Sequence, residues 1–166
     1  MLLLILAAAC GSENLSPTRP LPVTPVPAPS DLLGKYKLTF TAAPSCSLPP
    51  EAKQLTFEAW MFEETPGSIR VDLNTAFPCF CNPGFTGTRQ GDAFRFVIVG
   101  GPPGDETVVE LVGNGREVRY EGTATATQGD KNITGIFSGR ISVVESASGA
   151  TLATCDATDH KMDFVQ

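Results

Sequence analysis

The stretch from Glu117 to Val144 decides the fold, and it reads EVRYEGTATATQGDKNITGIFSGRISVV. Val118 and Tyr120 alternate with polar neighbours, and threonine, valine and isoleucine recur on both sides of the segment Gln128–Asn132. Alternation with period two is typical of antiparallel strands that have one face in water. The glycine and asparagine of the intervening segment supply the positive φ that a tight turn needs. The stretch therefore predicts two β-strands joined as a hairpin.

The same pattern extends outward from this hairpin through most of the chain. Phe94, Phe96 and Ile98, for example, share one face of another short run, and little helical periodicity is present after Leu32. Short runs rich in β-branched and aromatic residues alternate with turn residues, which predicts strands. The predicted strands are Gly34–Ala42, Gln54–Glu63, Ser68–Leu73, Gly84–Gln90, Ala93–Val99, Thr107–Gly113, Glu117–Thr127, Ile133–Val144 and Leu152–Val165, of which the last could be broken.

This succession of strands predicts an all-β fold, an antiparallel up-and-down β-barrel of about eight strands. Closure of a barrel removes the exposed strand edges that a secreted β-protein has to protect. An antiparallel β-sandwich is the alternative. One segment differs from the rest: residues 45–53, SCSLPPEAK, predict a loop with a single helical turn.

The opening of this domain also carries a resemblance. Gly34-Lys35-Tyr36 resembles the Gly-x-Trp opening of lipocalin-like and avidin-like barrels, with tyrosine in place of tryptophan. The later rhythm of strand, glycine turn and strand is similar to that of small avidin-like barrels. The resemblance implies a small closed barrel, in agreement with the strand pattern.

The N-terminus predicts export and lipidation. Leu2–Ala9 is an apolar run of eight residues, too short for a membrane span, which needs about 20 residues. It fits the core of a signal peptide. The small residues before Cys10-Gly11-Ser12 resemble the lipobox of bacterial lipoproteins, although leucine is commoner at position 7 and no basic residue precedes the run. The resemblance implies cleavage before Cys10 and acylation of its thiol.

A proline-rich segment separates this signal from the folded domain. Six prolines fall between Ser16 and Ser30, and proline favours the extended polyproline II conformation. The predicted organisation is a signal peptide over residues 1–9, a lipidated cysteine with a proline-rich linker over 10–31, and the β-barrel domain over 32–166. Gly11 stands where an aspartate favours inner-membrane retention, so the lipoprotein resemblance implies the outer membrane if the source is Gram-negative.

The cysteine count agrees with lipidation. Of five cysteines, Cys10 would carry lipid, which leaves an even set of four for an oxidising compartment. Four cysteines allow three pairings. We favour Cys46 with Cys155, because the first and last strands of a barrel are neighbours, and Cys79 with Cys81. A redox or metal role for Cys79 and Cys81 is the alternative, but a metal site needs about four ligands and the chain holds one histidine.

Candidate functional residues are few. Aromatic side chains at Phe57, Trp60, Phe96 and Tyr120 could line an apolar pocket in the barrel, or they could be core. Asp159 and His160 could serve acid–base chemistry, but no nucleophile motif accompanies them and a structural histidine is the alternative.

These observations predict a non-enzymatic lipoprotein of the cell envelope. Its barrel would bind a small apolar or amphipathic ligand; alternatively, a filled barrel would contact an envelope partner, or, distantly, Asp159 and His160 would serve a hydrolase. We expect no metal or cofactor. The net charge is −6 and the basic residues are scattered, which argues against nucleic acid as a partner.

Mass spectrometry of the protein extracted from membranes tests the anchor. We expect an N-terminal cysteine, Cys10, that carries acyl chains, because the lipobox-like junction directs cleavage and acylation there. An intact Met1 or an unmodified Cys10 would contradict the prediction.

Overall fold

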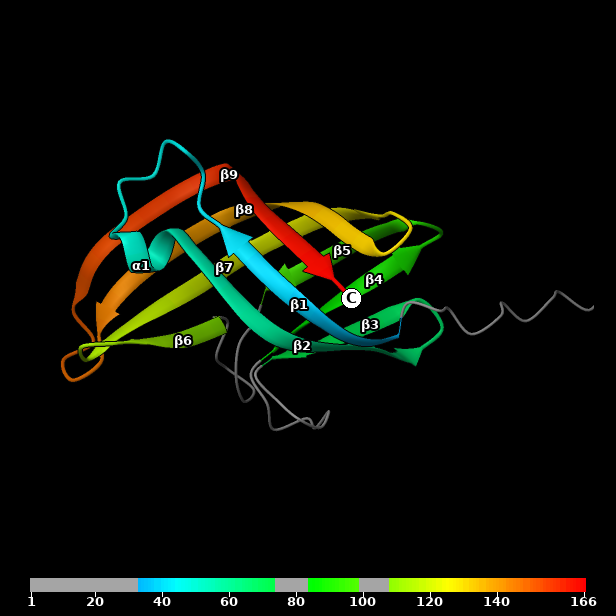
Figure 1. Ribbon diagram of the computed structural model, residues 1–166, viewed down its shortest axis with the longest axis horizontal. Helices are drawn as coiled ribbons and strands as arrows, with labels where there is room; N and C mark the ends of the chain where they lie inside the picture. The colour runs from blue at the N-terminus through cyan, green and yellow to red at the C-terminus, as the bar shows by residue number, and fades with distance from the viewer. Residues whose placement is uncertain (1–32, 74–83, 99–107) are drawn as a thin grey trace, which may run out of the picture. The chain divides into compact units, whose positions relative to one another are not determined.

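The computed structural model describes residues 33–73, 84–98 and 108–166. These residues form nine strands and one helical turn, and the strands lie within a few residues of their predicted positions (Figure 1). The elements are β1 (Gly34–Thr41), α1 (Pro50–Lys53), β2 (Gln54–Thr65), β3 (Ser68–Leu73), β4 (Gly84–Gln90), β5 (Ala93–Ile98), β6 (Val108–Gly113), β7 (Arg116–Gln128), β8 (Asn132–Glu145) and β9 (Thr151–Val165).

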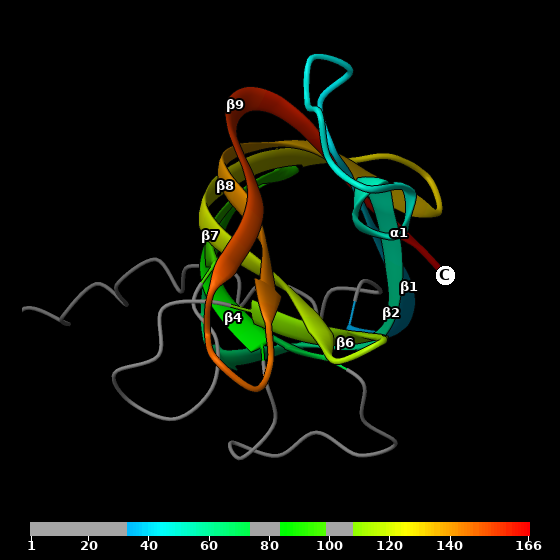
Figure 2. The same ribbon diagram turned by 90° about the vertical axis from the view of Figure 1, so that its left-hand side faces the viewer.

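The strands close into an antiparallel barrel, so the barrel prediction is confirmed and the sandwich alternative is wrong. The order runs from β5 through β4, β3 and β2 to β1, and onward through β9 and β8 to β7. Pairing of β5 with β7 completes the ring. Figure 2 looks along the barrel and shows the strands around its axis. Because β1 pairs with β9, the first and last strands are neighbours, as predicted.

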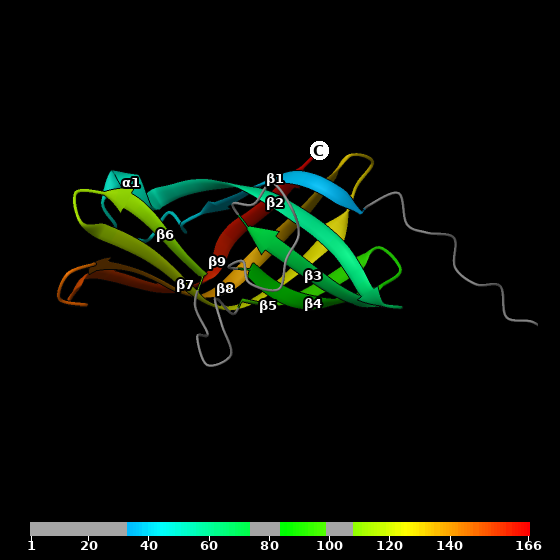
Figure 3. The same cartoon turned by 90° about the horizontal axis from the view of Figure 1, so that it is seen from below.

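Eight strands make the closed ring, and β6 is an additional one. It pairs with β7 alongside β5: Ile98 of β5 lies opposite Gly122, and Val108 of β6 lies opposite Tyr120. Both strands are antiparallel to β7, so they run in the same direction along it. β6 therefore continues the line of β5 after the connection 99–107, which lies outside the described residues (Figure 3).

Aromatic side chains fill the interior of the barrel. Phe40 of β1 stacks on Tyr120 of β7, with 4.6 Å between ring centroids. It also meets the rings of Phe57, Phe85 and Phe137 edge-on. All five side chains are at most 2% exposed. Edge-on and stacked rings add to the stabilisation from apolar burial, so this cluster is a main source of the stability of the barrel.

Two glycines make room for one of these rings. Gly122 of β7 and Gly139 of β8 lie opposite one another in the ladder. A Cβ atom would lie 2.9 Å from the ring of Phe137 at Gly122 and 2.8 Å from it at Gly139. Gly122 also has a φ of +152°, which side-chain-bearing residues rarely adopt. The glycines thus allow the ring to lie directly against the backbone of its neighbours.

Replacement of Phe40 by alanine tests the importance of the aromatic cluster. We expect Phe40→Ala to lower the free energy of unfolding by about 3–5 kcal/mol, because it leaves a cavity at the centre of the ring contacts. Urea denaturation measures the loss. Ile136→Ala is the control, since Ile136 is 45% exposed and a surface change costs about 0.5 kcal/mol or less. Equal losses for the two variants would contradict the prediction.

Candidate functional site

Three of the four predicted pocket residues lie in the interior of the barrel, and the fourth lies on its outer face. Phe57, Phe96 and Tyr120 point into the interior and are at most 1% exposed, and the rings of Phe57 and Tyr120 lie 6.1 Å apart. Trp60 projects from the outer face instead, where the ammonium group of Lys35 lies 5.2 Å from its ring centroid. The interior three therefore belong to the packed core, and Trp60 lies on the other side of the sheet.

Two hollows of the described surface are lined by other residues. One, of about 320 Å³, lies at the rim near the C-terminus and is lined by Lys35, Tyr36, Lys37, Glu58, Val165 and Gln166. There the amide of Gln166 donates a hydrogen bond of 3.0 Å to the hydroxyl of Tyr36. Burial raises the pKa of Tyr36 above its usual value, and the hydrogen bond from Gln166 partly opposes this effect.

A larger groove, of about 610 Å³, crosses the outer face of four neighbouring strands. Most of the residues that line it are small or hydroxyl-bearing. The strands supply Thr88 and Gln90 from β4, Ala93, Phe94 and Arg95 from β5, Thr125, Ala126 and Thr127 from β7, and Thr134, Gly135 and Ile136 from β8. We call this the outer groove.

Arg95 is the one cation in the lining of the outer groove. Thr88 of β4 and Thr125 of β7 lie directly opposite Arg95 in the two adjoining ladders, so a hydroxyl-bearing residue stands on either side of it. Exposed aliphatic side chains lie on the same face, Val97 at 47% exposure and Ile136 at 45%. A guanidinium group beside hydroxyl groups is suited to hold a carboxylate or phosphate group.

Arg95 also differs from the other described arginines in its bonding. Each of the others makes an ion pair or hydrogen bond: Arg70 with Asp72, Arg89 with Gly91 and Gln128, Arg116 with Glu51, Arg119 with Glu117 and Arg140 with Asp156. Within residues 33–73, 84–98 and 108–166, Arg95 has no such partner. Arg95 can therefore bind an external anion without first losing an ion pair or hydrogen bond within the described part of the protein.

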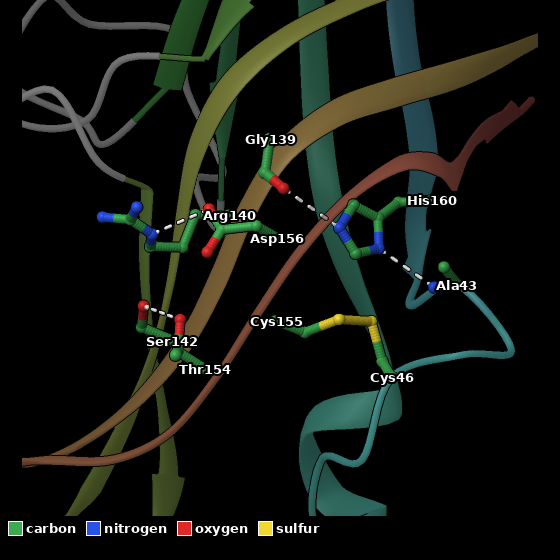
Figure 4. The surroundings of a disulfide bond; sticks show 9 residues. All are labelled: Ala43, Cys46, Gly139, Arg140, Ser142, Thr154, Cys155, Asp156 and His160. Carbon is green, nitrogen blue, oxygen red and sulfur yellow. Dashed lines mark hydrogen bonds and ion pairs between the residues drawn. A yellow bond between two sulfur atoms is a disulfide. The ribbon is translucent and has the colours of Figure 1, made fainter.

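A disulfide joins Cys46 to Cys155, as predicted (Figure 4). Cys46 lies in the loop after β1 and Cys155 lies on β9, with 5.6 Å between their Cα atoms. The bridge thus ties the loop between the first two strands to the last strand. Cys10, Cys79 and Cys81 lie outside the described residues.

His160 holds the same loop through a second bond. Its Nδ1 accepts a hydrogen bond of 2.9 Å from the backbone N–H of Ala43, so Nε2 carries the proton and donates to the carbonyl of Gly139 at 3.2 Å (Figure 4). The ring stacks on Phe137 and is fully buried. Both ring nitrogens thus bond to backbone groups, while Asp159 is exposed. His160 serves the structure of the loop and is not aligned with Asp159 for proton transfer.

Burial also lowers the pKa of His160 below 6.5. The hydrogen bond to Gly139 and the carboxylates of Asp159 and Asp156 oppose this effect but do not cancel it. The neutral ring is therefore the form that the folded protein stabilises.

Two further observations bear on function. Among the described residues, no group of three or more histidine, cysteine, aspartate or glutamate side chains is arranged to hold a metal ion. None of the described helices has the length and apolar character that a membrane span requires.

Stability measured against pH tests the role of His160. In the unfolded chain the imidazole takes up a proton near pH 6.5, whereas the folded protein resists protonation to a lower pH. We therefore expect the contribution of His160 to the free energy of unfolding to be complete above about pH 6.5. This contribution should be lost as the pH drops below that value. His160→Gln keeps a hydrogen-bond acceptor without titrating, so it should lack this component. Parallel losses in both proteins between pH 7.5 and 5.5 would contradict the assignment.

Comparison of the chain with known protein families, with curated proteins and with solved structures found no match.

Proposed function

We propose that this protein is a non-enzymatic envelope lipoprotein whose filled barrel contacts an envelope partner through its outer surface. The lipobox-like junction at Cys10 supports the membrane anchor. Pairing of Cys46 with Cys155 supports an oxidising compartment, where disulfides persist. The proline-rich linker between anchor and domain supplies a semi-rigid spacer, which suits a domain that has to reach a partner.

The packed interior is the observation that carries this choice. Phe40, Phe57 and Tyr120 contact one another at the centre of the barrel, and each is at most 1% exposed. An apolar ligand in the interior, the other function predicted from the sequence, would have to displace these ring contacts. Core packing is close, and forced insertion of further atoms costs about 1–3 kcal/mol or more. Recognition through the outer surface carries no such cost.

The outer groove is the proposed contact surface. Protein interfaces are enriched in arginine and depleted of lysine and of acidic residues, and their central contacts are more apolar than their rim. Arg95 between Thr88 and Thr125, with Ile136 beside them, has this composition. The partner would contribute an aspartate or glutamate to Arg95. The lining of the groove exposes no aromatic side chain, since Phe94 is only 3% exposed, which favours a protein partner over a sugar chain.

Site-specific photocrosslinking in intact cells tests the proposal. A photoreactive amino acid at position 127, at the edge of the outer groove, should give a discrete adduct with one envelope protein. Arg95→Glu should reduce the adduct at least about tenfold, since the loss of a charge-assisted contact costs 1.4 kcal/mol or more. Mass spectrometry of the adduct should locate an acidic residue at the contact.

Lys131→Glu is the matched control, because it makes the same charge change in the exposed turn between β7 and β8. It should leave the adduct unchanged. Equal losses from Lys131→Glu and Arg95→Glu would show that the effect is one of net charge and would reject the groove. An apolar ligand retained in the purified protein under native mass spectrometry would instead support the ligand-binding function.

A further inference from the structure

The loop between β1 and β2, residues Ala42–Lys53, inserts into the barrel at one end. Ala43, Cys46, Leu48 and Ala52 are each at most 6% exposed and belong to the core cluster, while the residues between them are more exposed. A hydrogen bond of 2.8 Å from Ala42 N–H to the carbonyl of Lys53 closes the base of the loop. The loop is therefore part of the packed core, although it lies outside the strands.

Three bonds of different chemistry attach this loop to the barrel. The disulfide joins Cys46 to Cys155, and the imidazole of His160 accepts the N–H of Ala43. Glu51 of α1 forms an ion pair of 2.9 Å with Arg116 of β7, but both side chains are more than a third exposed, so it contributes little. Figure 4 shows the disulfide and the imidazole bond side by side between the loop and β9. These two bonds are the main specific bonds between the loop and β9, and we call them the latch.

Each bond of the latch responds to a different condition. A dithiol reductant of the envelope would convert the disulfide to two thiols, with transfer of two electrons and two protons, and would itself become a disulfide. Protonation of His160 would place a hydrogen on Nδ1, so that two donors, this N–H and that of Ala43, would face each other. The imidazolium would also be buried at 0% exposure, which disfavours the charge.

The charged groups around His160 are those of its own strand and of β8. Asp156 and Asp159 on β9 favour the protonated ring. From β8, Arg140 is bonded to Asp156, and Gly139 contributes only its carbonyl. From the loop, only the backbone N–H of Ala43 is bonded to the ring. None of these groups places a carboxylate in direct contact with the imidazole. Movement of the loop is therefore the change that most stabilises a protonated ring.

The two bonds act on the same segment, since Cys46 follows Ala43 by three residues. While the disulfide is intact, loss of the imidazole bond cannot move this part of the loop away from β9. After reduction, the imidazole bond is the remaining directional bond between this part of the loop and β9, beside the apolar burial of the loop residues. We infer that opening of the latch requires two conditions. The β1–β2 loop leaves the barrel end only when the disulfide is reduced and His160 is protonated. This inference is independent of the proposed partner.

The single histidine of the chain makes the coupling directly measurable. Reduction and protonation both favour the open loop, so reduction changes the proton affinity of His160 by the same factor as protonation changes the equilibrium constant for reduction of the disulfide. In NMR titrations of the imidazole we expect the pKa to be higher in the reduced protein by at least about 0.5 unit, a threefold change in proton affinity. Equal pKa values in the two redox states would overturn the inference.

Amide hydrogen exchange of the full chain measures the opening itself. In the oxidised protein, protection of the Ala43–Leu48 amides, corrected for intrinsic exchange, should change less than about twofold between pH 7.5 and 5.0. In the reduced protein it should fall at least about tenfold over the same interval. Opening of the oxidised loop at pH 5.0, or an unresponsive reduced loop, would overturn the inference. Simultaneous loss of protection in β8 would indicate global unfolding and would also overturn it.

Two variants separate the latch from other effects of the reductant. Cys79→Ser/Cys81→Ser should behave as the wild type in both states, because the latch does not involve these cysteines. Reduced His160→Gln should lose the dependence of loop protection on pH, since glutamine can accept the N–H of Ala43 and does not titrate. A reduced His160→Gln loop that still opens on acidification would assign the response to another group.

Discussion

The pairing of β1 with β9 is the constraint on which the rest of the structure depends. Lys37–Thr41 of the first strand pairs with Lys161–Val165 of the last. Without this ladder both strands would be open edges, and the aromatic interior would be exposed along a seam. The ladder also brings the loop after β1 next to β9, where Cys155 and His160 bind it. Closure, disulfide and imidazole bond thus follow from one register.

Much of this fold could be predicted from local sequence. Alternation and turn residues identified all nine strands, and the positive φ of Asn114, +53°, marks a turn between the predicted strands Thr107–Gly113 and Glu117–Thr127. The strand Leu152–Val165 could not be read as continuous, because the register of β9 shifts against β8 between Ala157 and His160. A bulge of this kind interrupts the alternation on which sequence patterns depend. The local sequence also contains no signal that β5 and β6 both pair with β7.

The site residues could be predicted only in part. Pairing of Cys46 with Cys155 followed from the neighbouring first and last strands. Trp60 lies in a run that is apolar on both faces, so its outward orientation could not be inferred from alternation. The importance of Arg95 depends on Thr125 lying beside it, which requires the ring-closing contact between β5 and β7. The sequence pattern contained each residue of the outer groove, but not their proximity.

The break between β5 and β6 gives the barrel a natural point of insertion. The chain leaves β7 at the position of Gly122 and returns at that of Tyr120, two residues or roughly 7 Å away. Because the partner strand holds both ends, the intervening segment can change in length without a change of register elsewhere. The entropic cost of a longer loop is small, about 0.6 kcal/mol for each doubling. Residues can therefore be added between β5 and β6 while the pairing of the barrel strands stays constant.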